Sequence, residues 1–566
     1  MRSLGPCSAE WPPGIQSAGL SVIGSQLNSP RPRFRPEIFA VLRSPVFKAA
    51  TVLVVLGLVP RLFWLKSTAT HVDGLLPLGS YLWLHAGEGN LLNIFFLSRD
   101  YTYPPGQYLL TLPLLSWVQS YQDVLFWFRL PSLLAWTAGL GGAFLLVHRV
   151  LGPRGLLPAL AVSVLALFSW RGWIEGSQGY VYASTFPLTA MMAFFVLTES
   201  GRRWLADPLP AFGIGIIWGI SLWFSYQMLF VAAASFAFIG LRSLHRRSGR
   251  EITGTIAAAA GFGIPAAIVY HQILRTVLQW ASGTPSWAGG LPMDGIRGGM
   301  TFPLTAWFEV VQSNFSFMPW GWPSKVFAFG WLLLVAGGLF RVWRNKALRT
   351  SCGSALWWLV AIVVVFTAGP YLGKFPLGAT RHSFVLTVPM LLATAIALRG
   401  YNFSGRAYSG GLVVGAVVFA VNFLPFWERT RNHVDLQLLH DEMQAAPSAR
   451  MVDLPGSYTW DHVLLAWKSP QMLDRLKRSA DLKADADWEN WVTETPTCFL
   501  LSHRAPLSSV DRERLLVAGA GRIETLAEQP PVGGTELAGI INGGNGFYLY
   551  RVHSTGSPAP AVEGLP

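Results

Sequence analysis

Charged residues are scarce in this chain of 566 residues, because Asp, Glu, Lys and Arg together make up only 13% of it while hydrophobic residues make up 52%. Soluble domains carry about 25% charged residues. The mean hydropathy is +0.39. This shortage of charge excludes an ordinary soluble domain and predicts a membrane protein.

Cysteine is rare as well. The three cysteines are Cys7, Cys352 and Cys498, and they fall in segments that we expect in different compartments. This spacing excludes both a disulfide framework and a cysteine metal site.

The first 45 residues lack the apolar core and the small-residue cleavage site of a secretory signal peptide. They are instead polar and rich in Pro, Ser and Arg. We therefore expect 1–45 to be a cytoplasmic, disordered segment, and the first apolar stretch to be an uncleaved membrane anchor.

Apolar stretches long enough to cross a bilayer recur from Ala49 to Phe426. A membrane-spanning helix needs roughly 20 apolar residues, and we count about eleven such stretches. The sequence therefore predicts a polytopic α-helical membrane protein whose membrane domain covers 46–427.

Basic residues gather in a few short loops between these stretches, and they account for most of the net charge of +13. Cytoplasmic loops carry an excess of Lys and Arg, so these loops orient the chain and require no nucleic-acid partner. The residues that we place on the cytoplasmic side are Arg31, Arg33, Arg35, Arg43, Lys48, Arg149, Arg154, Arg202, Arg203, Arg242, Arg246, Arg247, Arg250, Arg341, Arg344, Lys346, Arg349, Arg399 and Arg406.

Carboxylates gather in the segments between the basic loops, and we expect these segments to face outward. The segments are 66–123, 171–180, 272–325, 371–382 and everything after Glu428. Their acidic residues include Asp73, Glu88, Asp100, Asp123, Glu175, Asp294 and Glu309. The charges collect at the ends of the expected spans, which favours chemistry at the outer membrane surface.

The first outer segment, 66–123, has about 58 residues, many more than a connection needs. Two stretches within it, 75–89 and 103–120, mix apolar and aromatic residues with Gly and Pro, and they predict helices that lie in the membrane interface. His71 and Asp73 precede them, in STATHVDGLLPLGS. Asp73 is a candidate catalytic base; alternatively, it caps the helix that follows.

A second group of polar residues lies in KFPLGATRHSF, 374–384. Lys374, Arg381 and His382 fall at the outer ends of two expected spans, where membrane insertion does not explain cations. These residues predict a binding site for an anionic headgroup. Alternatively, Arg381 only anchors its helix at the interface.

Four segments occur in a characteristic order along 48–427: TYPPGQYLL (102–110), FRLPSLLAW (128–136), EGSQGYVYA (175–183) and PLGATRHSFVLTVPMLL (376–392). In this order they resemble the Tyr-Pro-Pro helix, the Arg-Leu-Pro-Ser helix, the second outer loop and a late span of the GT-C class of membrane glycosyltransferases. That class uses polyprenyl-phosphate sugars and includes protein O-mannosyltransferases, aminoarabinose transferases and rhizobial core-sugar transferases. The resemblance implies a GT-C fold.

The resemblance also implies a reaction at the outer face. A sugar moves, with inversion, from a polyprenyl phosphate to an acceptor hydroxyl, with Asp73 as the general base and with Arg381 and Lys374 holding the departing phosphate. The family usually carries an acidic pair in the first outer loop, whereas Gly74 follows Asp73 here. This chemistry requires no metal or other cofactor, since the leaving group is already activated, and a bound divalent metal stays an open alternative. The further candidates are Asp100 for catalysis, Arg129 and Arg61 for the phosphate, and His71, Tyr103, Glu175 and His382 for substrate binding.

Two of these candidates have structural alternatives. Asp100 alternatively pairs with Arg99 or begins a turn before Pro104. Glu175 is alternatively a solvated loop residue.

The chain after Glu428 predicts a separate outer α/β domain over 428–555. Its expected strands are ARMVDLPG, TCFLLSHR, GRIETLAE and GFYLYRV, and its expected helices lie around 461–478 and 509–518. The last residues, 556–566, are expected to be disordered.

Two other functions compete with glycosyl transfer. A secondary transporter or a flippase of lipid-linked sugars would place ionisable groups near the middle of its spans. An O-antigen ligase or polymerase would carry one large outer loop late in the chain, whereas the largest loop here comes first and 272–325 is only a partial counterpart. We therefore expect a multi-pass transferase of the cytoplasmic (inner) membrane. Its partners would be the lipid bilayer, a polyprenyl-phosphate-linked donor, and a glycan, lipid or protein acceptor.

Overall fold

The computed structural model describes most of the chain. The described residues are 44–65, 104, 106–115, 117, 121–177, 179, 182–271, 296–315, 322–372, 377–378, 381–429, 436–453, 475–478, 482, 485–502, 506–530 and 547–555.

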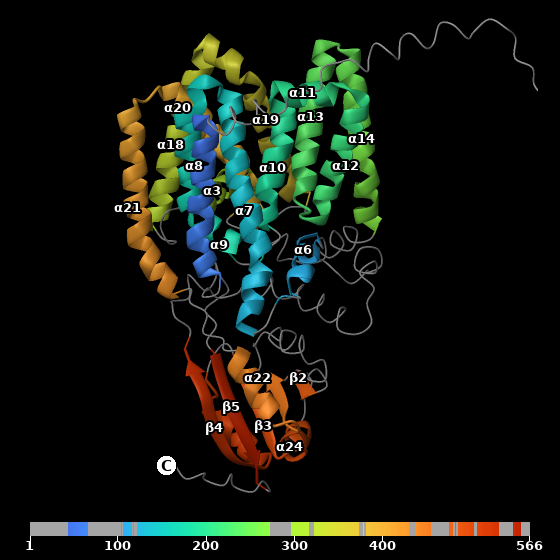
Figure 1. Ribbon diagram of the computed structural model, residues 1–566, viewed down its shortest axis with the longest axis vertical. Coiled ribbons are helices and arrows are strands. Elements are labelled where there is room, and N and C mark those ends of the chain that lie inside the picture. Colours follow the sequence, from blue (N-terminus) through green and yellow to red (C-terminus); the bar gives the residue numbers. More distant parts are fainter. Residues whose placement is uncertain are drawn as a thin grey trace, which may run out of the picture. The chain divides into compact units, whose positions relative to one another are not determined.

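Helices form the described chain up to α21 (Figure 1). The α-helices are α3 (Pro45–Trp64), α6 (Gly106–Leu115), α7 (Tyr121–Leu151), α8 (Leu156–Phe168), α9 (Trp170–Ser177), α10 (Tyr182–Leu197), α11 (Glu199–Ala206), α12 (Pro208–Ile220), α13 (Met228–Arg246), α14 (Gly249–Val269), α17 (Ile296–Phe315), α18 (Trp322–Arg344), α19 (Lys346–Tyr371), α20 (Thr387–Tyr401) and α21 (Gly405–Arg429). Short 3-10 helices are η1 (Pro153–Gly155), η2 (Ser221–Trp223) and η4 (Arg381–Leu386).

Eight helices in the described part of the chain are long and apolar enough to cross a membrane. Two bent pairs raise the number to ten if each counts as one span: α8 with α9, bent by 63°, and α11 with α12, bent by 108°. Helix α10 is apolar but has only 16 residues. The chain is therefore a multi-pass helical membrane protein, and α10 would be an eleventh span among the described helices if it also crosses.

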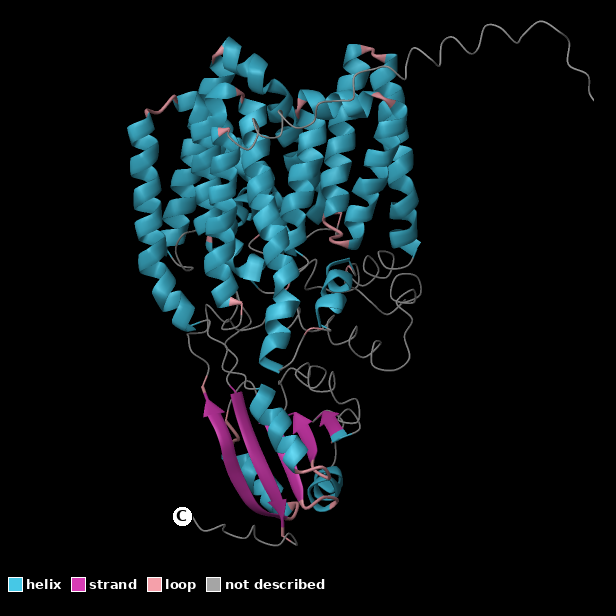
Figure 2. Cartoon of the chain, viewed as in Figure 1, coloured by secondary structure: helices cyan, strands magenta, loops and turns pink. Residues whose placement is uncertain are grey.

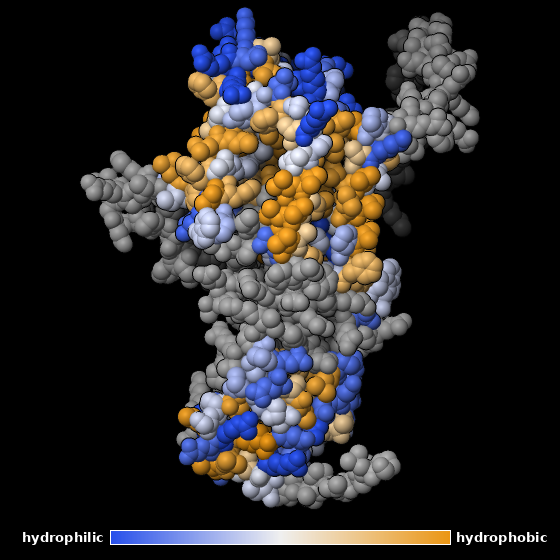
Figure 3. Space-filling model, turned by 90° about the vertical axis from the view of Figure 1, so that its left-hand side faces the viewer, coloured by the Kyte–Doolittle hydropathy of each residue, from blue (hydrophilic) through white to orange (hydrophobic). Residues whose placement is uncertain are grey.

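The helices present an apolar band to their surroundings, with hydrophilic side chains at one end of the bundle (Figure 3). Helices α7, α13, α18 and α20 finish at this end with Arg149, Arg246, Arg344 and Arg399 in or beside their last turns. We call it the arginine-rich end. Helices α10 and α13 begin at the opposite end, and α3 and α8 finish there.

Glycines let neighbouring helices pack closely. A Cβ atom added at Gly215 of α12 would overlap the carbonyl group of Ala258 in α14, and one added at Gly261 of α14 would overlap that of Phe212 in α12. Such close backbone approach is how small residues hold helices together in a membrane, where lipid removes the hydrophobic driving force.

Strands appear in the described chain only after residue 449, in a small α/β unit (Figure 2). Its elements are α22 (Leu436–Ala445), β1 (Arg450–Asp453), β2 (Leu476–Arg478), α24 (Asp485–Thr493), β3 (Thr497–Ser502), α25 (Ser509–Val517), β4 (Ala520–Gln529) and β5 (Phe547–Ser554). The strand order is β2-β1-β3-β5-β4. Strand β1 runs parallel to β2 and β3, whereas β5 runs antiparallel to β3 and β4.

Burial explains why these strands form. Leu500 on β3 pairs with Tyr550 on β5, and both side chains lie in one apolar core with Val452, Trp488 and Trp491. All four expected strands are confirmed, and the expected helix at 509–518 is confirmed as α25.

The prediction of a helix at 461–478 is wrong for the last three residues of that range. They form β2, which pairs with β1 in the register Val452↔Lys477. The sequence could not show this strand, because a parallel edge strand of three residues is defined by its partner and not by a local pattern.

Candidate functional site

Three of the segments that carry the sequence resemblance contact one another through their described residues, at the end of the bundle opposite the arginine-rich end, and the fourth contributes to α6. Helix α6 packs against α7. A Cβ atom at Gly176 of α9 would lie 3.0 Å from the Trp136 ring of α7. Tyr182, which begins α10, contacts His382 of η4. The described parts of 128–136, 175–183 and 376–392, which are far apart in the sequence, thus lie together at one end of the bundle.

The 102–110 segment also packs against the turn before α13. A Cβ atom at Gly106 would come 2.8 Å from the backbone carbonyl oxygen of Trp223 in η2 and 3.0 Å from the Phe224 ring. Helix α6 confirms that part of the expected interfacial stretch 103–120 is helical; its depth in a membrane stays a prediction.

His382 lies in a polar cluster built by three elements. Its Nδ1 atom is 2.8 Å from the Gln227 Nε2 atom, just before α13, and 3.2 Å from the Tyr182 hydroxyl group of α10. Ser225 donates to the Gln227 Oε1 atom. The amide nitrogen of Gln227 therefore donates to Nδ1, and the proton of the neutral ring lies on Nε2. We call His382, Tyr182 and Gln227 the His382 cluster.

The chain beside this cluster is fixed from a second side. Asn314 of α17 donates from Nδ2 to the carbonyl oxygen of Ser383, at 3.1 Å. Since Ser383 follows His382 directly, helix α17 holds η4 in place while Gln227 holds the imidazole ring. A rigid support of this kind is what a binding or catalytic side chain needs.

A buried ion pair lies on α9. The Arg171 Nε atom is 2.8 Å from the Glu175 Oε1 atom, with the two side chains 6% and 2% exposed. Residues 171–177, part of the segment that we expect to face outward, are helical and buried and do not form a solvated loop. The solvated alternative for Glu175 is therefore excluded. Its carboxylate balances a guanidinium group inside the bundle.

Arg61 does not occupy a phosphate-binding position. Its side chain is fully buried, and its guanidinium group stacks between the rings of Trp136 and Trp173, with its Cζ atom 3.7 and 3.9 Å from their centroids. It donates to the carbonyl oxygens of Gly57, at 3.0 Å, and Leu167, at 3.1 Å. The geometry corrects our expectation, because this side chain ties α3 to α8 and to the two indoles.

Arg129 contacts the end of α3. Its side chain is fully buried, and Nη1 donates to the carbonyl oxygen of Leu65, at 2.5 Å. A helix leaves its last carbonyl groups without partners inside the helix. Arg129 thus supplies a donor just after the last residue of α3, and its role in holding a phosphate stays a prediction.

Most of the remaining candidates lie outside the described residues: His71, Asp73, Asp100, Tyr103 and Lys374. Arg381 begins η4, but its side chain is not among those described. The proposed base and both main phosphate ligands therefore stay predictions. Of the substrate-binding candidates, the structure places Glu175 in the α9 ion pair and His382 in its cluster.

Sequence reasoning misses three residues of this region. Tyr182 and Arg171 lie inside or beside the EGSQGYVYA segment, but their sequence neighbours do not indicate a role. Gln227 lies 155 positions before His382. Its one local signal is that it is a polar residue at the start of an apolar helix, which is also common at helix ends without a function.

The described residues contain no group of three or more His, Cys, Asp or Glu side chains that could hold a metal ion. The residues of the His382 cluster offer hydrogen-bond donors and acceptors, which suit a sugar or a phosphate group.

Comparison with protein-family models found no match, and comparison with curated proteins found none either. Among solved structures, the chain is similar to ArnT from Cupriavidus metallidurans bound to undecaprenyl phosphate. The two chains are 10% identical, the match covers 93% of this chain and 100% of that chain, and the TM-score is 0.47. For apo ArnT from the same organism, the identity is 12%, the coverage is 91% and 98%, and the TM-score is 0.32.

Proposed function

We propose that this protein is a membrane glycosyltransferase of the GT-C type. It moves a sugar from a polyprenyl-phosphate donor to an acceptor hydroxyl group at the outer face of the cytoplasmic membrane. The single observation that supports this proposal best is the contact among three of the resembling segments at one end of the helix bundle, through Trp136, Gly176, Tyr182 and His382.

That end of the bundle has the features of a reaction site at a membrane surface. Ionisable and polar side chains are costly within a bilayer and usually have a function there. Here the His382 cluster and the Arg171–Glu175 pair lie where several spans begin or end. A donor with a long lipid tail would present its sugar at the same depth, since the phosphate group remains at the interface.

The proposed reaction is one inverting displacement. The Asp73 carboxylate takes the proton of the acceptor hydroxyl group, and the acceptor oxygen forms the new bond to the anomeric carbon. The bond from that carbon to the phosphate oxygen breaks, and the polyprenyl phosphate leaves with the electron pair. Arg381 and Lys374 stabilise the charge on the departing phosphate.

His382 would assist its neighbour Arg381. Gln227 and Tyr182 fix the imidazole ring through Nδ1. We propose that the fixed ring helps to position the adjacent Arg381 for the donor phosphate. The donor sugar and the acceptor depend on the shape of the pocket around these groups.

The activity is tested with the purified protein and a panel of polyprenyl-phosphate sugars. We expect release of polyprenyl phosphate that depends on an acceptor extract. If no donor releases lipid phosphate, while reconstituted vesicles move a lipid-linked sugar across the bilayer, the protein is a flippase or transporter.

The assignment of roles is tested with three variants. Arg381→Ala should weaken donor binding about ten- to a hundred-fold, since it removes a charge-assisted contact. Lys325→Ala is the matched control, because it removes an exposed cation from the first turn of α18 at the same end of the bundle.

Asp73→Asn keeps helix-capping ability but removes the base, so transfer should fall about 100-fold or more with donor binding retained. Normal transfer by Asp73→Asn would place the base elsewhere.

A further inference from the structure

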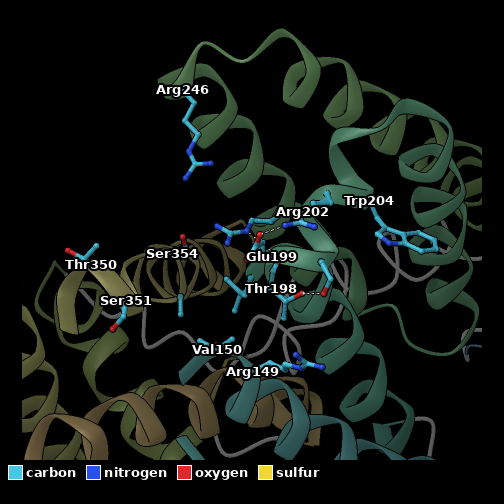
Figure 4. Close-up of a pocket in the computed structure, with 14 residues that line it drawn as sticks. Arg149, Val150, Thr198, Glu199, Arg202, Trp204, Arg246, Thr350, Ser351 and Ser354 are labelled. Carbon is cyan, nitrogen blue, oxygen red and sulfur yellow. Dashed lines mark hydrogen bonds and ion pairs between the residues drawn. The ribbon is translucent and has the colours of Figure 1, made fainter. Parts of the chain in front are cut away.

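A pocket of about 720 Å³ opens at the arginine-rich end of the bundle, away from the proposed reaction site. Figure 4 shows Arg246 entering it from α13 on one side and Arg149 from α7 on the other, with α11 and α19 completing the wall. Helix α10 begins at the His382 cluster and ends at this pocket. Its 16 residues therefore separate the two sites by about 24 Å.

The wall of the pocket carries a large excess of positive charge. Four of the lining residues are arginines: Arg149, Arg202, Arg203 and Arg246. Glu199 is the one carboxylate among the lining residues, and it pairs with Arg203 at 2.5 Å. Three positive charges thus have no counter-charge in the wall itself, although Arg246 also lies 3.4 Å from Glu251 nearby.

Two of these arginines have free donors. Arg202 donates from Nε to the carbonyl oxygen of Thr198, at 3.2 Å, and its terminal nitrogens have no acceptor among the described residues. Arg149 has no hydrogen-bond or ion-pair partner within the part of the chain that the structure describes. Side-chain hydroxyl groups, such as that of Ser354 on α19, line the same wall.

Membrane insertion alone does not explain this arrangement. The positive-inside rule predicts how many basic residues a loop carries, but it does not predict that arginines of three helices should line one pocket. Other arginines at this end lie on aromatic rings instead. The guanidinium carbon of Arg344 lies 5.6 Å from the centroid of the Phe340 ring, and that of Arg349 lies 5.7 Å from the centroid of the Trp343 ring. They satisfy the same rule without forming a pocket.

We infer that this pocket is a second binding site, separate from the reaction site, for a phosphate-bearing anion. Guanidinium groups match phosphate oxygens in geometry and charge, and hydroxyl groups add neutral donors. The phosphate would belong either to an anionic phospholipid headgroup or to a soluble phosphate compound. Trp204, which also lines the pocket, is 59% exposed; exposed Trp side chains at this depth are typical of the headgroup region.

The test uses the full-length protein in neutral detergent. One arm titrates inorganic pyrophosphate by calorimetry. The other mixes the protein with equal amounts of phosphatidylglycerol and phosphatidylcholine and counts the retained lipids by native mass spectrometry. We expect binding in at least one arm. Pyrophosphate binding alone identifies a soluble ligand, and selective retention of phosphatidylglycerol identifies a lipid.

The variant Arg149→Gln/Arg202→Gln should weaken the binding that is found by about ten- to a hundred-fold. The matched control, Arg344→Gln/Arg349→Gln, removes the same charge from the same end outside the pocket and should change binding by less than about two-fold. Equal losses in both variants, or no binding by the wild-type protein in either arm, would overturn the proposal. If the double variant does not fold, Arg149→Gln alone replaces it, because that exposed side chain holds no described contact.

Discussion

Individual arginines in this protein are accommodated inside the helix bundle in different ways. Arg61 uses two indole faces and two carbonyl oxygens, Arg129 uses the carbonyl group beyond the end of α3, and Arg171 uses the carboxylate of Glu175. The guanidinium group suits all these settings because its charge is delocalised and its donors lie in one plane. Burial without such partners would cost several kcal/mol.

The Arg171–Glu175 pair gives a prediction at this scale. Glu175→Gln removes the carboxylate that lies 2.8 Å from the buried Arg171 guanidinium group, and we expect it to destabilise the protein by about 3–5 kcal/mol. The double variant Arg171→Met/Glu175→Gln should recover part of that loss.

The matched control is Glu199→Gln, which breaks an exposed pair of the same i,i+4 spacing, with side chains 77% and 73% exposed. It should cost no more than about 1 kcal/mol. Thermal unfolding in detergent measures all three, and equal effects of Glu175→Gln and Glu199→Gln would contradict a buried ion pair.

At the scale of elements, glycines determine how closely the segments around the proposed site approach. Gly179, between α9 and α10, has a φ of +75°, which is costly for other residues, and a Cβ atom there would overlap the Phe128 ring. At Gly106 the obstacle is the carbonyl oxygen of Trp223, which is backbone and cannot rotate away. Gly106 therefore lets α6 approach η2, and Gly179 lets the connection between α9 and α10 approach α7.

Alanine substitutions test whether these glycines are needed because a neighbouring segment leaves no room for a Cβ atom. Gly106→Ala should displace α6 from η2 and reduce sugar transfer at least about ten-fold while the bundle stays folded. Gly179→Ala should lower stability as well, by about 1–3 kcal/mol, because it adds backbone strain to the overlap. Gly213→Ala and Gly263→Ala are the controls, since an added Cβ atom there meets nothing within 4 Å. They should be neutral or stabilise by up to about 1 kcal/mol. Full activity of Gly106→Ala would show that α6 does not help to form the site.

At the scale of the whole molecule, the charges predict how the chain crosses the membrane. The arginine-rich end is expected in the cytoplasm and the α/β unit outside. Cysteine labelling tests this orientation well, because Cys352 and Cys498 are buried. Burial raises the pKa of the Cys498 thiol to about 11. Little of the reactive thiolate therefore exists near neutral pH, and introduced cysteines dominate the signal.

In cells whose outer barrier has been permeabilised, an impermeant maleimide should label Val517→Cys on α25, where the valine side chain is 84% exposed. It should not label Gly249→Cys, at the exposed start of α14 on the arginine-rich end, until the inner membrane is broken. Both variants carry Cys7→Ser, because Cys7 lies outside the described residues. The opposite labelling pattern would reverse the orientation, and it would place the proposed reaction site in the cytoplasm.

The sequence by itself determined the features that have a local physical cause. Long apolar stretches indicate membrane helices because lipid accepts few polar groups, and short stretches rich in apolar and aromatic residues indicate β1, β3 and β5, of which β3 and β5 are largely buried. The order of the four resembling segments was also readable, and it led to His382 and Glu175 as candidates.

The tertiary structure alone decided which of these residues meet and in what surroundings. Gln227 and His382 pair across 155 positions, and β2 forms because β1 offers it a free edge. Arg61 and Arg381 are similar in sequence terms, since each is an arginine near the end of an apolar stretch. Only packing showed that the partners of Arg61 are two indoles and two carbonyl oxygens. The physical reason is that burial and hydrogen bonding depend on the neighbours that the fold brings together. The sequence around one residue does not identify those neighbours.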